Sequence, residues 1–161
     1  MTAAPPTVAL RSLRSDDVAR VEAMTRAAGL FREEEIPVAL EVFEATARGR
    51  DTYEGLGADS AGSLVAWAAW GPTPGTLGTF DLYWIVVDPA WQSGGIGTAL
   101  LLEMERLVTG RARMIVVETA GRPDYAGTRA FYERRGYQAV AVIPDFYAPG
   151  DDQVTYIKTL A

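Results

Sequence analysis

The sequence predicts an α/β fold in which a mixed, mainly antiparallel central sheet is flanked by helices, in the element order βααβββαβαββ. Short apolar and aromatic runs separated by turn residues fill the middle of the chain, as in consecutive strands. Apolar residues recur at helical spacing on either side, and a strand-length apolar run separates the last two helical segments. The chain has 161 residues, 48% of them hydrophobic, so we expect one domain over residues 1–161, with residues 1–6 disordered.

The first third of the chain predicts a strand followed by two helices. Apolar and polar residues alternate over Thr7–Leu13, as in a half-buried strand. Ser15 offers a helix N-cap, with acidic residues in the next turn and an apolar face that continues to Leu30. A second helix is predicted from Glu33 to about Ala47, with Pro37 in its first turn, where proline costs least.

The middle of the chain predicts three antiparallel strands and a helix. The runs at 52–58, 63–71 and 78–89 are apolar or aromatic, and glycine, proline and serine separate them. A glycine-rich loop follows. We expect a helix from about Gly95 to Thr109, with Leu100, Met104 and Leu107 on its apolar side.

The last third predicts two further strand segments around a helix. Arg113–Thr119 reads as a buried strand. The next helix runs from about Tyr125 to Arg135, and Gly136 in a left-handed conformation ends it. Strands at Tyr137–Ile143 and Gln153–Leu160 close the chain around the turn-rich segment "PDFYAPGDD".

The composition excludes several kinds of chemistry. The chain contains no cysteine and no histidine, which excludes disulfides, thiolate nucleophiles, Ser-His-Asp hydrolysis and histidine-bound metals, so no metal site is expected. A formal net charge of −6 argues against a nucleic-acid partner and suits a cationic or neutral small molecule. Neither a signal peptide nor a membrane-length apolar segment is recognisable, so we expect a soluble, cytoplasmic protein with no membrane partner.

The loop "QSGGIGT", Gln92–Thr98, stands directly before a predicted helix. The N–H groups at a helix start lack internal partners and attract anions, and glycines let the backbone approach a phosphate closely. A plain strand-to-helix turn would have the same composition. The P-loop pattern is absent because no Gly-Lys-Ser/Thr follows, and the dinucleotide fingerprint is absent because Leu100 occupies the place of its third glycine.

Two separated motifs resemble the GNAT superfamily of N-acetyltransferases. The first is Gln92-x-x-Gly95-x-Gly97 after an aromatic-rich strand, and the second is "TRAFYERRGY" further along the chain. The predicted element order is similar to that family from about residue 7 to 160. The resemblance implies an acetyl-CoA-dependent N-acetyltransferase, in which a primary amine of a small molecule attacks the thioester directly.

The resemblance also implies where coenzyme A is held. The pyrophosphate would meet the loop amides of Gln92, Ser93, Gly94, Gly95, Ile96, Gly97 and Thr98, and the pantetheine arm would pair with the backbone of Ile85, Val86 and Val87. Tyr125 stands where many members have asparagine, and Gly94 stands where a basic residue is usual, so the backbone is left to bind the pyrophosphate. Arg129, with Arg134 or Arg135, is a candidate for the outer phosphate, although three arginines on one helix also fit a solvated face.

Three residues are candidates for proton transfer. By resemblance, Tyr132 is the acid that protonates the departing thiolate, and its alternative role is a core aromatic beside Phe131. Asp81 is the leading candidate for the base that accepts the amine proton, and Glu118 is the alternative. Each of these carboxylates could instead have a structural role or pair with a charge on the substrate. Water could also carry the proton to solvent.

The acceptor site is expected near the first helices and the last two strands. Phe31, Tyr83 and Trp84 would form an apolar wall, and Asp145 and Tyr147 would contact an ammonium group by charge and cation–π attraction. A capped hairpin would equally explain Asp145 and its neighbours. Two other functions stay open: a non-catalytic acyl-CoA-binding regulatory module and a protein N-terminal acetyltransferase. A homodimer is expected only by analogy with the family.

Overall fold

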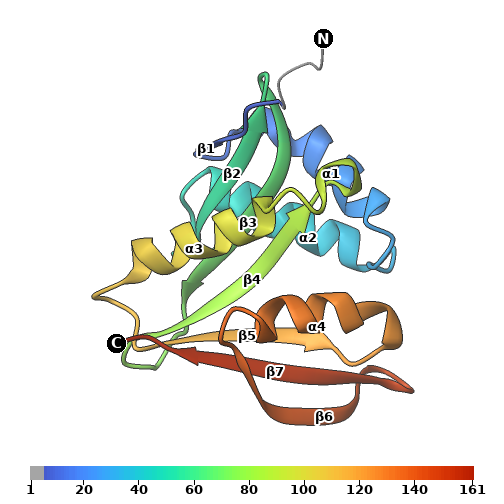
Figure 1. Cartoon of the computed structure of the whole chain (residues 1–161), viewed down its shortest axis with the longest axis vertical. Helices are drawn as coiled ribbons and strands as arrows, with labels where there is room; N and C mark the ends of the chain where they lie inside the picture. The colour runs from blue at the N-terminus through green and yellow to red at the C-terminus, as the bar shows by residue number, and fades with distance from the viewer. Residues whose placement is uncertain (1–5) are drawn as a thin grey trace. The chain divides into compact units, whose positions relative to one another are not determined.

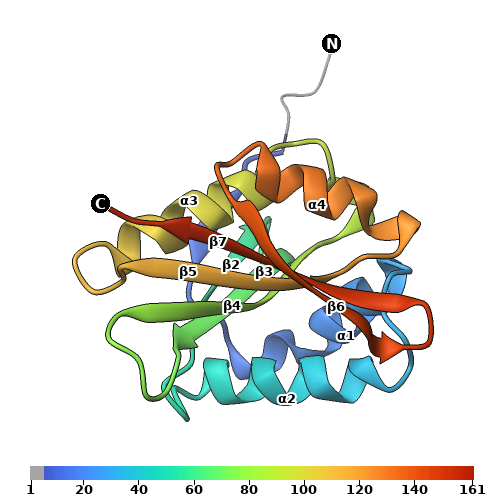
Figure 2. The same cartoon turned by 90° about the horizontal axis from the view of Figure 1, so that it is seen from below.

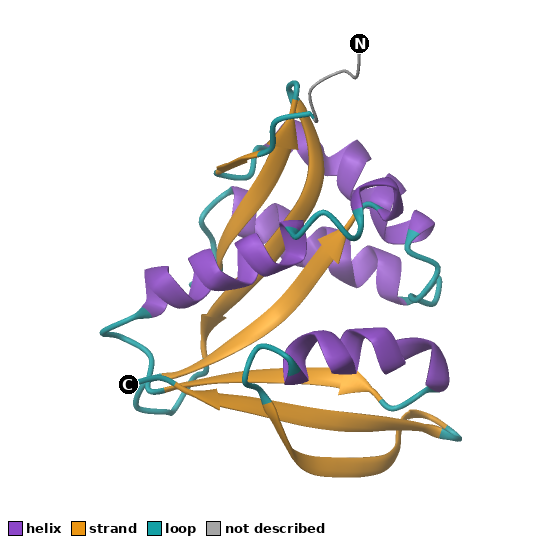
Figure 3. Cartoon of the chain, in the orientation of Figure 1, coloured by secondary structure: helices purple, strands orange, loops and turns teal. Residues whose placement is uncertain are grey.

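The computed structural model describes residues 6–161, and the expectation of disorder over residues 1–6 falls, except for Pro6, outside them. The helices and strands occur in the predicted order (Figures 1 and 3). The strands are β1 (Ala9–Arg11), β2 (Glu54–Ser60), β3 (Ser63–Pro72), β4 (Thr79–Val87), β5 (Met114–Ala120), β6 (Gln138–Ala148) and β7 (Asp151–Thr159). The α-helices are α1 (Val18–Ala27), α2 (Glu35–Ala47), α3 (Ile96–Val108) and α4 (Ala126–Glu133), and the 3-10 turns are η1 (Ser15–Asp17), η2 (Pro89–Trp91) and η3 (Pro123–Tyr125).

The strands form a seven-stranded sheet in the order β1-β2-β3-β4-β5-β7-β6. The pairs β1–β2, β2–β3, β5–β7 and β6–β7 are antiparallel, and β4–β5 is parallel, which confirms a mixed, mostly antiparallel sheet. The chain divides into two compact units, one of Met1–Trp70 with Trp84–Val108 and the other of Gly71–Tyr83 with Thr109–Ala161. Strand β4 therefore contributes residues to both units.

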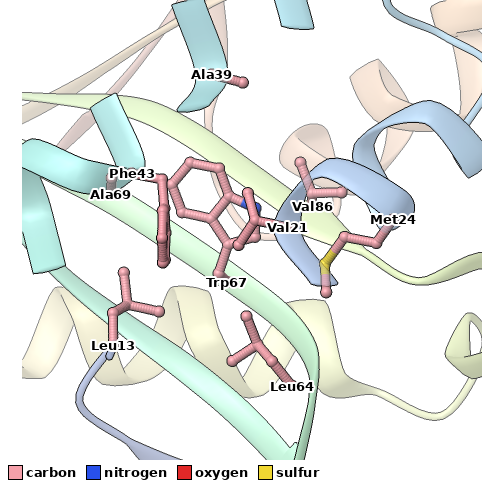
Figure 4. Close-up of a cluster of buried hydrophobic side chains, with 9 residues drawn as sticks. All are labelled: Leu13, Val21, Met24, Ala39, Phe43, Leu64, Trp67, Ala69 and Val86. Carbon is pink, nitrogen blue, oxygen red and sulfur yellow. The ribbon is translucent and has the colours of Figure 1, made fainter. Parts of the chain in front are cut away.

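In the first unit, α1 and α2 cover one face of β2 and β3, and α3 covers the other (Figures 1 and 2). The core beneath α1 and α2 centres on the fully buried Trp67, with Phe43 on one side and Val21 on the other (Figure 4). The Phe43 ring meets the Trp67 ring edge-on at 5.7 Å between centroids. A buried tryptophan excludes so much apolar area from water that truncation to alanine costs about 3–5 kcal/mol, so this cluster fixes how the helices sit on β3 and β4.

In the second unit, α4 covers one face of the strands in the order β4-β5-β7-β6 (Figure 2). Leu82, Val117 and Tyr156 are register partners across β4, β5 and β7, and Tyr156 lies 6.2 Å from Tyr132 of α4 between ring centroids. Successive side chains of a strand alternate between faces. Asp81 and Glu118, one residue away from those partners, therefore project from the face opposite α4.

The structure corrects three details of the sequence prediction. Ser15 does not cap α1, because residues 15–17 form a 3-10 turn and the helix begins at Val18. Leu107 is 37% exposed, whereas Leu100, Leu101, Met104 and Val108 are buried along α3. The segment predicted as a loop around residues 144–152 is instead the end of β6, a tight turn at 149–150 and the start of β7.

The turn before α1 is held by charge. Asp17 accepts a hydrogen bond from the Arg14 backbone N–H at 2.8 Å and a bidentate pair from the Arg11 guanidinium at 2.8 and 2.9 Å. Arg11 also donates to Asp59 of β2 at 2.8 Å. The carboxylate of Asp17 makes no side-chain cap on α1, but through Arg11 it ties the turn before this helix to β1 and β2.

Candidate active site

The glycine-rich loop has two residues with left-handed backbone conformations directly before a helix. Ser93 and Gly95 both adopt left-handed φ values, 71° and 77°, and α3 begins immediately afterwards at Ile96. A Cβ built at Gly95 would have nothing within 4 Å, so the loop is open above this residue. Alternating left-handed and extended or helical residues turn successive N–H groups toward one point, and the helix start adds its dipole.

The two ends of the loop are fixed in the first unit. Ile96 is only 6% exposed and Leu100 is fully buried, so α3 is anchored in the core from its first residue. At the other end, the N–H of Asp88 donates to the carbonyl of Val65 at 2.9 Å. The Gln92 side chain donates to the Val87 carbonyl at 3.5 Å, so it turns back toward β4.

The strand that leads into the loop combines buried and half-buried residues. Val86 is 4% exposed and packs in the core, whereas Ile85 and Val87 are half-buried. In the second unit the parallel ladder between β4 and β5 ends at Leu82 and Val117. Beyond Val117, β5 pairs only with β7 within this unit, so the other edge of β5 has no strand partner there.

Two carboxylates lie close together on the sheet face opposite α4. Asp81 accepts a hydrogen bond of 2.6 Å from the Thr73 hydroxyl, which fixes its orientation. Burial, and then the negative charge of Asp81, raise the pKa of Glu118 above its ordinary value. A glutamate with a raised pKa holds a proton more readily, which suits a general base. The sequence does not predict a role for Thr73 beside Asp81, because Thr73 lies in a segment whose residues indicate only a turn.

Tyr132 sits on the other face, on α4. It is 3% exposed, and its ring contacts Phe131, Tyr137 and Tyr156 at centroid distances of 5.3, 5.6 and 6.2 Å. Burial raises the pKa of Tyr132 well above the ordinary tyrosine value, so the phenol stays protonated. The neighbouring Tyr156 donates to Glu133 at 2.9 Å, whereas the Tyr132 hydroxyl makes no hydrogen bond among residues 6–161. The Tyr132 hydroxyl is therefore protonated and has no hydrogen-bond partner among residues 6–161.

The predicted contacts at the start of α4 have protein partners. Arg129 donates to the carbonyls of Ala120 and Arg122 at 2.8 and 2.9 Å, which fastens the connection between β5 and α4. Tyr125 is 9% exposed, and the Arg122 guanidinium lies 4.9 Å from its ring centroid. Arg135 stacks on the Phe131 ring at 3.9 Å. These bonds give Arg129 a structural role that competes with phosphate binding.

The predicted acceptor residues fall into three places. Phe31 and Trp84 touch in the first unit, with ring centroids 5.0 Å apart and both half-buried. Tyr83, in the second unit, is 39% exposed. Asp145 has a left-handed φ of 55° and accepts the Gly150 N–H at 2.7 Å, and Tyr147 packs on Phe146 at 5.0 Å. The carboxylate of Asp145 thus shapes the β6–β7 turn, as the hairpin alternative anticipated.

Residues 6–161 contain neither a candidate membrane span nor a candidate metal cluster. No helix there is long and apolar enough to cross a membrane. No group of three or more acidic side chains is placed to hold a metal ion.

Comparison with known proteins shows the family. Residues 51–139 match the acetyltransferase (GNAT) domain. A solved structure of a GNAT-family protein from Desulfovibrio desulfuricans shares 39% identity and a TM-score of 0.88, over 96% of this chain and 100% of that one. The ribosomal-protein-S18-alanine N-acetyltransferase of Escherichia coli is 20% identical, with a TM-score of 0.77 over 96% and 95% of the two chains.

A curated relative points the same way. S-(2-succino)cysteine N-acetyltransferase of Bacillus subtilis is 33% identical over 69 residues, and the match spans 42% of this chain and 42% of that protein. Fold and relatives together define an acyltransferase enzyme. The chain belongs to the GNAT family of N-acetyltransferases, whose members bind acetyl-CoA, and the resemblance seen in its two motifs is confirmed.

Proposed function

We propose that the protein transfers an acetyl group from acetyl-CoA to a primary amine of a small molecule by direct attack. The observation that carries this proposal is the loop before α3, where Ser93 and Gly95 are left-handed and the space above Gly95 is open. Such a loop fits a pyrophosphate held by backbone N–H groups. The donor supplies an activated thioester carbonyl.

The coenzyme A contacts are proposed along the segment from β4 to α3. Backbone groups of Ile85, Val86 and Val87 would pair with the pantetheine amides as an added strand does. The amides from Gln92 to Thr98 would hold the pyrophosphate, with Ser93, Gly94, Gly95, Ile96 and Gly97 between them. Tyr125 and Arg129 are further proposed contacts to coenzyme A. To reach a phosphate, Arg129 would have to give up its hydrogen bonds to the carbonyls of Ala120 and Arg122.

For the proton transfers, we assign Glu118 as base and Tyr132 as acid. Glu118 has the raised pKa, whereas Asp81 is hydrogen-bonded to Thr73 and supplies the charge that helps raise it. The amine nitrogen bonds to the acetyl carbon while its proton passes to Glu118, directly or through water. As the carbon–sulfur bond breaks, Tyr132 gives its proton to the sulfur, and solvent restores both groups. The products are an acetamide and free thiol.

The acceptor is proposed to be a small amine with an apolar portion. The half-buried aromatic pair Phe31–Trp84 and the exposed Tyr83 are proposed to offer apolar contact, and the carboxylates of Asp81 and Glu118 to attract an ammonium group. A small-molecule acceptor is also what the name of the Bacillus relative states for that protein. Protein N-terminal acetylation is the second candidate, since the Escherichia coli structure with this fold bears the name of such an enzyme.

We further propose that the protein is a cytoplasmic homodimer. Strand β6 forms the edge of the sheet and exposes Val140, Val142 and Ile143, which supports a homodimer through this edge. We place the protein in the cytoplasm, as a single acetyltransferase domain, because its proposed donor is an intracellular metabolite. Light scattering of the purified chain tests the dimer.

The function is tested by incubating the protein with acetyl-CoA and a panel of small amines and N-terminal peptides. We expect thiol release and an acetylated product, identified by mass, with at least one small amine. Acetylation of peptides alone would favour the second candidate. Binding of acetyl-CoA with no transfer to any acceptor would contradict the assigned acid and base.

A further inference from the structure

We propose that Arg20 is a positioning residue for the pyrophosphate loop, and that it acts by holding and neutralising Asp88. This inference rests on the proposed function of that loop. Arg20 lies on α1, and Asp88 is the residue at which β4 gives way to η2. All the groups concerned belong to the first unit.

Asp88 is bonded in three directions. Its N–H donates to Val65 at 2.9 Å, its Oδ1 accepts the Ala90 N–H at 2.9 Å, and its Oδ2 accepts Arg20 Nη2 at 2.6 Å. Arg20 Nε also donates to the Leu64 carbonyl at 3.1 Å. The guanidinium therefore bridges β3 and Asp88, the residue between β4 and η2, and it sets the direction in which the chain leaves β4 toward the loop.

The charge of Asp88 explains why a cation is needed there. The hydrogen bond from Arg20 is the main cause that lowers the pKa of Asp88, so the carboxylate is ionised at neutral pH. An ionised carboxylate at the start of an anion-binding loop repels a pyrophosphate, and the side chain of Asp88 is only 17% exposed, where solvent screens poorly. Arg20 cancels that repulsion and keeps the oxygen that caps η2.

The loop is the kind of segment that benefits from such an anchor. The far end is fixed by Ile96 in the core, and the near end by Asp88. A segment already held in its binding conformation loses less conformational freedom when a ligand arrives, so affinity rises. Loss of Arg20 should therefore weaken acetyl-CoA binding more than it slows the chemical step at saturation.

Arg20→Met tests the proposal, and Arg26→Met is its matched control on the same helix. Arg26 pairs with Glu22 and Glu33 on the surface, so its removal changes net charge equally without touching the loop. We expect the Kd for acetyl-CoA, measured by calorimetry, to rise about tenfold in Arg20→Met and to change less than twofold in Arg26→Met. Arg20→Lys should recover part of the loss, and kcat at saturating acetyl-CoA should stay within about threefold.

The double variant Arg20→Met/Asp88→Asn separates charge from packing. Asparagine keeps an oxygen for the Ala90 N–H and removes the negative charge, so we expect the double variant to bind acetyl-CoA more tightly than Arg20→Met alone. Equal affinities in Arg20→Met and Arg26→Met, or a loss confined to kcat, would overturn the proposal.

A measurement without ligand keeps the proposal distinct from the proposed function. The N–H groups of Ala90 and Trp91 both bond to Asp88, at 2.9 and 2.8 Å. We expect their amide hydrogen exchange, followed by NMR, to be faster in Arg20→Met than in Arg26→Met. If the wild-type chain binds no acetyl-CoA, the proposed function fails, while this exchange difference still decides whether Arg20 holds the loop. Unchanged exchange would overturn the anchoring role.

Discussion

Replacing Tyr132 by phenylalanine separates a catalytic hydroxyl from a structural one. The substitution keeps the ring and its contacts with Phe131, Tyr137 and Tyr156, and it removes a hydroxyl that bonds to no group among residues 6–161. No hydrogen bond is lost, so the free energy of unfolding should change by less than about 0.5 kcal/mol. Removal of a general acid typically costs about 10²–10⁴ in rate, or roughly 3–5 kcal/mol of barrier, so kcat should fall by at least a hundredfold.

The assay is thiol release at saturating acetyl-CoA and acceptor, with urea unfolding of the same samples. Tyr156→Phe is the matched control, because its hydroxyl donates to Glu133 at 2.9 Å. That variant should lose about 1 kcal/mol of stability and keep most of its activity. A Tyr132→Phe enzyme with kcat within threefold of wild type, or with an unfolding free energy lowered by more than 1 kcal/mol, would refute the assignment of Tyr132 as acid.

Three further predictions follow from the site and the fold. Burial, and then the charge of Asp81, raise the pKa of Glu118, so Asp81→Asn should move the rising limb of the kcat/KM profile to lower pH with the same acceptor; an unmoved limb would argue against Glu118 as base. Gly95→Val places a β-branched residue at φ 77° and should raise the Kd for acetyl-CoA at least a hundredfold, whereas Gly110→Val, at φ 85° and equally open, should leave that Kd unchanged. Burial raises the pKa of Asp17, but hydrogen bonds from Arg11 and Arg14 outweigh burial and lower it. The ion pair of Asp17 with Arg11 therefore stabilises the fold above about pH 4, and this stabilisation is lost as the pH falls further. Arg11→Met should lower the free energy of unfolding, measured in urea, by about 2–4 kcal/mol at pH 7 and by clearly less near pH 3.

The order and type of the elements could be predicted because each is encoded locally. Periodicity of apolar residues reports the buried face of a helix or strand, and glycine reports left-handed ends, as at Gly136 with φ 86°. Ser15 does not cap α1, since residues 15–17 form a 3-10 turn whose Asp17 carboxylate pairs with Arg11 of β1. Competition of that kind is decided by tertiary contacts, which no local pattern contains.

The sequence motifs name candidate site residues whose roles stay predictions, and the contacts between those residues could not be predicted from the sequence. The motifs pointed to Tyr132 and to the loop, but the left-handed φ of Ser93 belongs to a residue type that rarely adopts it. Arg20 and Asp88 are separated by 68 residues, and Thr73 and Asp81 meet only because a strand turns back on the chain. Long-range pairs such as these depend on register, and register depends on the whole sheet.

The proposed acid and the proposed base lie on opposite faces of the sheet, which has a consequence for the proposed reaction. Tyr132 packs against the face that carries Val117 and Tyr156, and Glu118 projects from the other face. Groups on opposite faces act on one carbon only where the sheet is interrupted, because a continuous ladder would separate them. The β4–β5 ladder ends at Leu82 and Val117, one residue before Glu118. On the proposed mechanism the edge of β5 beyond Val117 must therefore stay open, because the acceptor has to reach both Glu118 and Tyr132 past the end of this ladder.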